Sequence, residues 1–365
     1  MAAPALTNGG VAVAEEEEPP NSWPPAVEKR YERLEKVGKG MFGEVYRAWD
    51  RVDERVVAVK RLAGRTDDRF VQTGLRDFAR EAMSLAACRG HPSVVELLAT
   101  FADSSRSDGD CFVVTEYAGR MNLREYMKLR CDAGLPFREA EVRKAMRQLL
   151  RGVKRAHKVG VLHRDIQPEN VLVDDGTEDV IGQKKKKKRS KGIVYKICGF
   201  GMSEPAAQTE KDDYAMLASP SSYRAPELFL GSRDYDGRID TWGLGCIMAE
   251  LLAGTVNPLF VGEQVFTCML NLVGAKGIVE WPGLERLATP DRAAKLREEG
   301  CRETGHLREV FPEEFLSQAG FEVLRGLLES NPERRLTAAA ALRKPWFNRH
   351  SFGGCFKPCG GEVSP

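Results

Sequence analysis

Residues 160–173 read GVLHRDIQPENVLV, and this stretch decides the fold. Its polar centre, His163-Arg164-Asp165-Ile166-Gln167-Pro168-Glu169-Asn170, lies between two apolar runs. Asp165 is suited to accept the proton of an attacking hydroxyl, and Asn170, five residues further on, can hold a metal ion through its amide oxygen. Chance rarely produces eight residues in this order, so the segment predicts a catalytic loop with a general base and one metal ligand.

A glycine-rich turn precedes this loop by more than a hundred residues. Glycines without Cβ atoms let the backbone close over phosphate groups, so that its N–H groups can face them. Such a turn also occurs in ordinary hairpins, so on its own it is a weak signal. The candidate phosphate-binding residues are Val37, Gly38, Lys39, Gly40, Met41, Phe42, Gly43, Glu44 and Val45.

Lys60 strengthens this interpretation because it ends the strand-like run VAVK that follows the turn. From there an ammonium group can reach the α- and β-phosphates of a nucleotide. Glu81, on the predicted helix that follows, can supply the partner carboxylate. The alternative for Glu81 is a surface charge on an amphipathic helix.

Composition agrees with a protein of one large core or two smaller ones. The chain has 365 residues, 42% of them hydrophobic, and single cores stop growing near roughly 250–300 residues. No basic region followed by an apolar run stands at the start, so we expect a soluble, intracellular protein. The nine cysteines lie at wide spacings without a CxxC motif and are expected to be reduced thiols.

The net charge of +2 comes from one local run. Residues 184–189 and Lys191 supply seven positive charges, so the rest of the chain carries −5. This distribution does not favour specific nucleic-acid binding. The run is either a nuclear import signal or docking point, or a solvated loop tip, and we expect a nuclear or cytoplasmic protein.

The pattern along the chain predicts an α+β fold with two lobes. Residues 1–30 read as a disordered acidic and proline-rich leader, and residues 348–365 as a flexible tail. From Tyr31 to Lys60 short β-rich runs broken by glycine predict an antiparallel sheet. A helix follows up to Gly90, with Leu75, Phe78, Ala79, Ala82 and Leu85 at helical spacing as its apolar face. Beyond about Met121 the chain is mostly amphipathic helix, with an enlarged hairpin tip at 174–192.

Together these motifs resemble those of the eukaryotic protein kinases, from about Tyr31 to Phe347. Within that superfamily the chain is most similar to the cyclin-dependent kinases. The best support is YRAPELFLGSRDYDGRIDTWGLGCIMAELLAG, residues 223–254, with Trp281-Pro282-Gly283 further on. The resemblance also implies that Arg335 is the buried partner of Glu227.

The resemblance implies ATP and Mg²⁺ as cofactors and a protein substrate or docking partner. It places the small antiparallel β-sheet lobe with one helix at 31–118 and the larger, mainly α-helical lobe at 119–347. Thr115 is then the gatekeeper, and Val45 and Ala58 enclose the adenine ring. Glu116 and Ala118 would contact adenine through their backbones.

Two positions near the phosphates depart from the family. The family's Asp-Phe-Gly motif here reads Gly199-Phe200-Gly201, and glycine has no side chain to hold Mg²⁺. Losing most of the metal's contribution of several kcal/mol would slow transfer by roughly 10²- to 10⁴-fold. Gln167 stands where the family has a lysine, and glutamine donates a hydrogen bond without a positive charge.

The activation segment and the helix before it also depart from the family. The position of the activating threonine falls on Ala215, and Arg164 ordinarily helps to bind its phosphate. Asp212 and Asp213 could offer permanent carboxylates instead. Pro220 replaces the substrate-facing threonine. The helix segment LRDFARE, which ends at Glu81, lacks the cyclin-contacting signature, so the sequence does not support a cyclin partner.

Three hypotheses follow. The first is an ATP-dependent serine/threonine protein kinase of the cyclin-dependent kinase type, impaired by an altered Mg²⁺ site, with Asp165, Lys60, Glu81 and Asn170 as catalytic residues. The second is a pseudokinase that acts as a nucleotide-binding or scaffold module, with Mg²⁺ weakened or dispensable. The third, a nucleic-acid scaffold that uses the lysine run, is weak because one run makes electrostatic contacts without base readout. No membrane association is expected.

Overall fold

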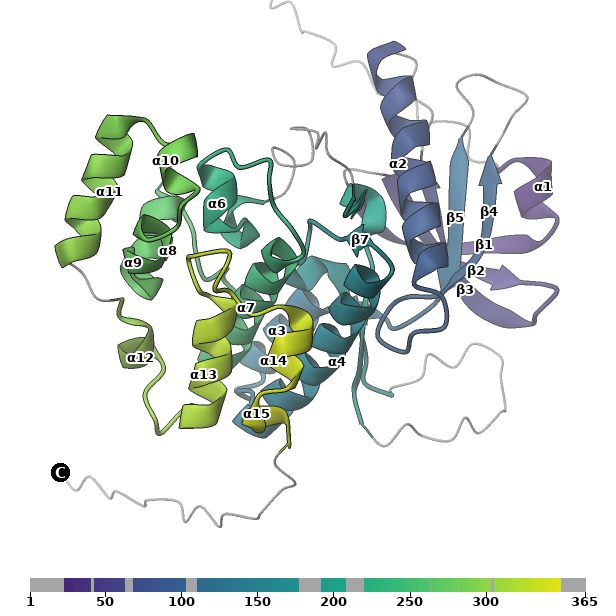
Figure 1. Ribbon diagram of the computed structural model, residues 1–365. Coiled ribbons are helices and arrows are strands. Elements are labelled where there is room, and N and C mark those ends of the chain that lie inside the picture. Colours follow the sequence, from purple (N-terminus) through teal and green to yellow (C-terminus); the bar gives the residue numbers. More distant parts are fainter. Residues whose placement is uncertain are drawn as a thin grey trace, which may run out of the picture.

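A five-stranded antiparallel sheet forms the smaller lobe of the computed structural model (Figure 1), in the order β1-β2-β3-β5-β4. The structure describes residues 23–40, 43–62, 68–102, 110–176, 192–207, 220–262, 264–302 and 305–348. The strands of this sheet are β1 (Tyr31–Gly40), β2 (Gly43–Asp50), β3 (Arg55–Leu62), β4 (Leu97–Ala102) and β5 (Cys111–Glu116).

Strand β3 shows how the sequence gives this sheet two different faces. Val57 and Val59 are fully buried, whereas Ala58 and Lys60 between them are only partly buried. Because side chains alternate across a strand, Ala58 and Lys60 lie together on the second face. Lys60 pairs in register with Val45 of β2. The candidate nucleotide residues therefore share one face of the sheet.

A short helix, α1 (Pro25–Glu28), covers the face that carries Val57 and Val59. Trp23 and Val27 are 3% and 1% exposed, and the Trp23 ring meets the Tyr46 ring edge-on at 5.6 Å. This corrects the expected boundary of the leader, because residues 23–30 are ordered. Two large apolar side chains in an otherwise polar segment bury enough surface to offset the entropy of ordering it.

Helix α2 (Asp68–Ala87) packs along β4 and β5 on the same lobe (Figure 1). Its buried side chains include Glu81, Ser84 and Leu85. Leu75, which periodicity assigned to the apolar face, is 59% exposed. The helix thus turns a partly polar face inward, toward the predicted site.

The larger lobe is built on helix α7 (Arg238–Ala253), in which every residue from Ile239 to Leu251 is buried. A helix that is buried on all sides belongs in a core, and this one also buries the polar residues Asp240 and Glu250. It packs against α4 (Glu139–Lys158) and α13 (Gln318–Leu327), and the large indole of Trp242 is fully buried. The other helices of this lobe are α3 (Leu123–Asp132), α6 (Pro226–Phe229), α8 (Val265–Val273), α9 (Lys276–Val279), α10 (Leu284–Leu287), α11 (Pro290–Arg302), α12 (Leu307–Val310), α14 (Ala338–Leu342) and α15 (Pro345–Asn348).

Short strands and 3-10 turns lie between the two lobes. The strands are β6 (Met121–Asn122), β7 (Val161–Leu162), β8 (Val171–Asp174), β9 (Val194–Ile197) and β10 (Glu204–Pro205), and the 3-10 helices are η1 (Pro168–Asn170), η2 (Phe200–Met202) and η3 (Ser221–Tyr223). β8 and β9 pair as an antiparallel hairpin. The lysine run at its predicted tip lies outside the described residues.

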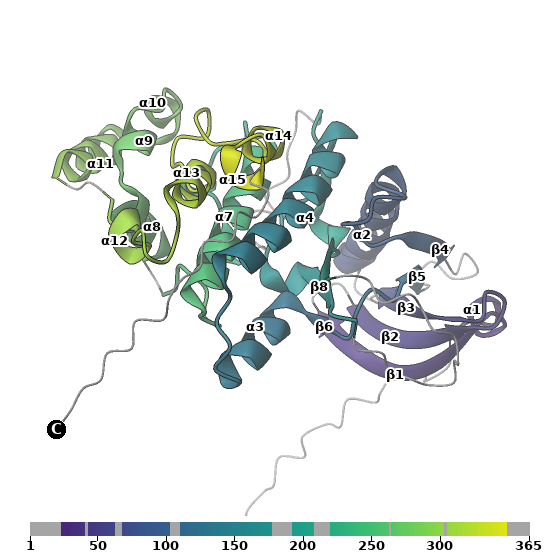
Figure 2. The ribbon, with the colours of Figure 1, turned by 90° about the horizontal axis from the view of Figure 1, so that it is seen from below.

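Helices α8 to α12 form a peripheral group on the side of the larger lobe away from the sheet (Figure 2). Trp281 is 5% exposed and belongs to a separate small core with Leu270, Ile278 and Leu284. The two-lobed α+β architecture predicted from the sequence is confirmed. Among the described helices, none is both long enough and apolar enough to span a bilayer.

Candidate phosphoryl-transfer site

Lys60 and Glu81 form an ion pair at the inner face of the sheet. The Nζ atom of Lys60, on β3, lies 2.6 Å from Oε2 of Glu81, on α2. Their side chains are only 17% and 6% exposed, so each limits the desolvation cost of the other. The structure thus brings together two residues that the sequence places twenty-one positions apart.

The glycine-rich turn connects β1 to β2, with Gly38 opposite Val45 and Gly40 opposite Gly43. Gly43 has φ +133°, and a Cβ atom there would lie 2.0 Å from the carbonyl oxygen of Arg61. Only glycine fits this approach of β2 to β3. Met41 and Phe42, at the tip, lie outside the described residues. The Glu44 carboxylate contacts two neighbouring side chains. It forms an ion pair with Lys36 and accepts a hydrogen bond from the Tyr46 hydroxyl.

Asp165 lies in the loop between β7 and η1, and both of its carboxylate oxygens accept hydrogen bonds from side-chain amides. Nε2 of Gln167 donates to Oδ1 at 2.6 Å, and Nδ2 of Asn170 donates to Oδ2 at 2.6 Å. Asn170 Nδ2 also lies 2.8 Å from the carbonyl oxygen of Asp165. Two neutral donors therefore fix the plane of the carboxylate without neutralising its charge.

Asp240, at the start of α7, holds the loop that contains Asp165 through hydrogen bonds to the loop backbone. Its carboxylate accepts hydrogen bonds from the backbone N–H groups of His163 at 2.9 Å and Arg164 at 2.7 Å. Nε2 of His157 lies 2.8 Å from its Oδ2. Burial works to raise the pKa of Asp240, but its hydrogen bonds with His157 and the backbone outweigh that effect and hold the pKa below its ordinary value. The sequence singled out Asp240 only as part of a family pattern.

Arg164, next to Asp165, is buried and has a left-handed backbone with φ +67°. Its guanidinium forms an ion pair with Glu204 of β10 and donates to the Tyr235 hydroxyl at 3.1 Å. Its Nε donates to the carbonyl oxygen of Met202 at 2.7 Å. The sequence did not predict Glu204 as a partner. Asp212, Asp213 and Ala215 of the activation segment lie outside the described residues.

Gly199 stands at the position for which the sequence resemblance predicts a metal-binding aspartate. It has φ +78°, and a Cβ atom there would lie 2.3 Å from Oδ1 of Asn170. The Asn170 amide thus fills the space beside it. Among the residues that the structure describes, no three His, Cys, Asp or Glu side chains form a metal-binding group. Mg²⁺ usually keeps one or two carboxylate ligands, and glycine at position 199 supplies none.

The segment that joins the lobes contains Thr115, Glu116 and Ala118. Thr115 lies opposite Ala58 across β3 and β5, and Ala118 is 5% exposed. The Glu116 carboxylate is bound to Lys196 of β9 at 2.5 Å. The link from Glu116 to Lys196 was not expected from the sequence, because it joins residues eighty positions apart.

Three further residues beside the site have no signal in the sequence. The hydroxyls of Ser84 on α2 and Ser203 after η2 are 2.7 Å apart and connect the Glu81 helix to the segment after Gly199. Cys198 precedes Gly199, and burial raises the pKa of its thiol to about 12. Such a thiol remains protonated and unreactive at neutral pH.

Comparisons with known proteins bear on this site. Residues 31–347 match the family model described as protein kinase domain. The chain is 44% identical over 324 residues to "Putative cyclin-dependent kinase F-2" of Oryza sativa subsp. japonica, covering 87% of this chain and 90% of that protein. It is 34% identical to cyclin-dependent kinase G-2 of Oryza sativa subsp. indica, covering 87% of this chain and 41% of that protein. It is 32% identical to cyclin-dependent kinase G1 of Arabidopsis thaliana, covering 87% of this chain and 49% of that protein.

The match extends over both lobes, and with the G-type kinases it spans less than half of the relatives' length. It includes the ion pair at Lys60, the loop at Asp165 and the buried ion pair between Arg335 and Glu227, whose two N–O distances are both 2.7 Å. The chain therefore belongs to the eukaryotic protein kinase family and, within it, to the serine/threonine kinases of the cyclin-dependent kinase type.

Proposed function

We propose that this protein transfers the γ-phosphoryl group of ATP to a serine or threonine hydroxyl of a protein substrate, at a rate reduced by the loss of the metal-binding carboxylate at position 199. The observation that carries the proposal is the Asp165 carboxylate, fixed by Gln167 and Asn170. A carboxylate held in this way is suited to receive the proton of the attacking hydroxyl.

Lys60 has the complementary role of binding the phosphates. Its pairing with Glu81 holds the ammonium at the inner face of the sheet, where a nucleotide in the family's position would present its α- and β-phosphates. Thr115, Ala58 and Val45 would enclose the adenine ring, and the backbones of Glu116 and Ala118 would hydrogen-bond to it. Asn170 would hold Mg²⁺ through its neutral amide oxygen.

The Arg164–Glu204 ion pair supports activity without a phosphate on the activation segment. In the family the arginine beside the catalytic aspartate helps to bind that phosphate, and here a carboxylate of the same chain is bound to it. A phosphate brings the same kind of charge-assisted contact to an arginine. We therefore propose that the Glu204 carboxylate permanently provides the negative charge that a phosphate on the activation segment provides in other family members.

Gly199 favours the second candidate, a pseudokinase that binds nucleotide and docks to partners. The Asn170 amide fills the space that an aspartate side chain would enter. In this alternative the Lys60–Glu81 pair would still bind ATP. The two candidates differ in turnover and not in nucleotide binding.

The deciding experiment measures transfer of radiolabelled phosphate from ATP to a generic basic protein, with and without Mg²⁺. The proposal predicts a weak signal that Asp165→Ala abolishes while thermal stabilisation by ATP is kept. Equal phosphate transfer by the natural protein and by Asp165→Ala would leave only the pseudokinase. Loss of stabilisation by ATP, with metal and with chelator, would remove both candidates.

The partner of this protein and its location in the cell also have signals in the sequence. We propose a docking partner other than a cyclin, because LRDFARE lacks the cyclin-contacting signature. We also propose that the lysine run directs nuclear import. Deleting residues 184–191 should shift the protein toward the cytoplasm in cells, and unchanged nuclear accumulation would refute the import role.

A further inference from the structure

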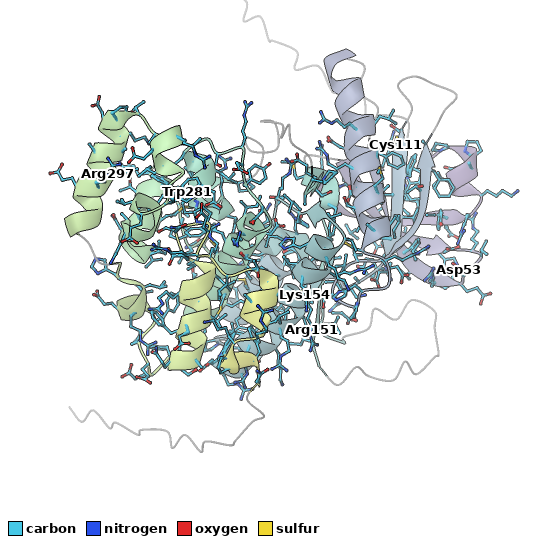
Figure 3. The ribbon with its side chains drawn as sticks, viewed as in Figure 1. Asp53, Cys111, Arg151, Lys154, Trp281 and Arg297 are labelled. Carbon is cyan, nitrogen blue, oxygen red and sulfur yellow. The ribbon has the colours of Figure 1, made fainter. Side chains whose placement is uncertain are left out.

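A basic cavity lies on the larger lobe, between the outer face of α4 and the C-terminal helices α14 and α15. Its volume is about 910 Å³. Six of its lining side chains are lysine or arginine. These cationic residues are Arg147, Arg151, Lys154, Arg155, Lys158 and Arg343. Figure 3 labels Arg151 and Lys154, which lie beside these C-terminal helices.

No carboxylate lines this cavity, and none of its six cations forms an ion pair with any residue in the described part of the chain. The positive charges of these residues instead lower the pKa values of neighbouring groups. Burial, and then the charges of Arg151 and Arg143, lower the pKa of Arg147. Burial, and then Arg155 and Arg151, lower the pKa of His91 at the rim. This cavity is therefore a local excess of positive charge.

Five of the cations follow one face of α4, at positions 147, 151, 154, 155 and 158. With a rise of 1.5 Å per residue, the row is roughly 16 Å long, which is the length of about five residues of extended peptide. The opposite face of the helix is buried in the core through Leu149 and Val153. The row is therefore fixed on a rigid element.

Two arginines of the row are already held in place by backbone carbonyl groups. Arg147 donates to the carbonyl oxygen of Phe347, and Arg155 donates to that of Ala87 at 3.0 Å. The Nε atom of Arg155 is buried and has no hydrogen-bond partner among the described residues. Ordering these side chains in advance lowers the entropy cost of binding an anion.

We propose that this cavity docks an acidic linear segment of a partner protein, rich in aspartate and glutamate or phosphorylated. The straight row of cations fits successive charges on an extended chain, and the partly exposed Leu342 and Ala339 can contact intervening side chains. The Phe347 ring is only 5% exposed, so it offers no stacking surface for nucleic-acid bases. This docking role is independent of catalysis.

The test uses the full-length protein and a fluorescent eight-residue peptide of alternating glutamate and leucine, with anisotropy as the readout. Arg151 and Lys154 are exposed, so Arg151→Glu with Lys154→Glu should fold normally. The matched control is Lys276→Glu with Lys295→Glu, two exposed lysines on α9 and α11, which changes the net charge equally. Thermal unfolding of both variants verifies that they are folded.

We expect the peptide to bind the natural protein, with affinity falling as salt rises. The cavity variant should lose about tenfold or more in affinity, and the control variant should lose less than about twofold. Equal losses in both variants would show that only net charge matters and would overturn the proposal. It would also be overturned by a glutamine–leucine peptide that binds equally well, or by a DNA duplex that displaces the peptide at lower concentration than unlabelled peptide does.

Discussion

Arg164 and Glu204 form an ion pair in which the two side chains are only 3% and 1% exposed. The pair connects the catalytic loop to the short strand β10, and the Tyr235 hydroxyl contacts both partners. Because Arg164 has a left-handed backbone, this set of contacts also holds an unfavourable conformation next to Asp165. The pair therefore helps to hold the shape of the loop that contains Asp165.

Replacing Glu204 by alanine should destabilise the protein by about 3–5 kcal/mol, since it leaves a buried guanidinium without its anion. Urea unfolding followed by tryptophan fluorescence measures the change. The double variant Glu204→Ala with Arg164→Leu should recover part of the loss, because both buried charges are then gone. A single variant as stable as the natural protein would show that Arg164 finds another partner.

Lys60 and Glu81 should act as one unit in nucleotide binding. Lys60→Met and Glu81→Gln should each weaken ATP binding, and the double variant should lose less than the sum of the two, because the residues are in direct contact at 2.6 Å. Isothermal titration of the four proteins of the cycle with ATP gives the coupling energy. Additive losses would mean that the ion pair does not position the ammonium.

Gly199→Asp should raise Mg²⁺-dependent phosphate transfer by at least about tenfold, since it restores a carboxylate ligand. The gain should stay below the full effect of the metal, because the new side chain must displace the Asn170 amide. Gly199→Asn is the matched control, as it has the same shape without the charge. Equal rates for the two variants would exclude a metal role for position 199.

Glu250 on α7 should make stability fall as the pH rises from 5 to 8. Burial raises its pKa to about 7, in spite of the neighbouring Arg124. Below about pH 4.3 both folded and unfolded chains carry the proton, and between that pH and 7 only the folded chain keeps it. The free energy of unfolding therefore decreases through this window, by at most about 1.4 kcal/mol per pH unit.

Glu250→Gln does not titrate, so its urea midpoint should change less between pH 5 and 8 than that of the natural protein. Glu141→Gln provides the control. Burial works to raise the pKa of Glu141, but hydrogen bonds from Arg130 and Arg138 hold it at about 2, outside this window. The Glu141 variant should keep the slope of the natural protein. If the slope survives in Glu250→Gln, another group is responsible.

The two lobes, the polar loop at Asp165 and the Arg335–Glu227 pair could be predicted from the sequence, because each depends on a run of residues with a characteristic order or on family resemblance. The partners that complete the site could not. Glu204, Ser203 and Lys196 are joined to the site by contacts that cross between elements distant along the chain. No local pattern marks a polar residue that finds its partner only after the lobes have formed.

Periodicity also failed where a polar side chain faces inward. On α2 the apolar pattern placed Leu75 in the core, whereas it is exposed, and the buried face includes Glu81 and Ser84. A hydrophobic pattern assumes that charge stays outside, and this helix buries a carboxylate because Lys60 lies opposite it. The basic cavity was missed for a different reason. Its cations come from α4 and from residues near 343, and only the packed helices bring them together.

Trp23 and Val27 cover the outer face of the sheet. Their loss matters when the gene is shortened to the matched kinase region. A recombinant fragment that starts at Tyr31 would lose both side chains and uncover Tyr46 and Phe112. Exposed aromatic surface of this kind promotes aggregation during expression. A fragment that begins a few residues before Trp23 should remain in solution at concentrations where the shorter one precipitates.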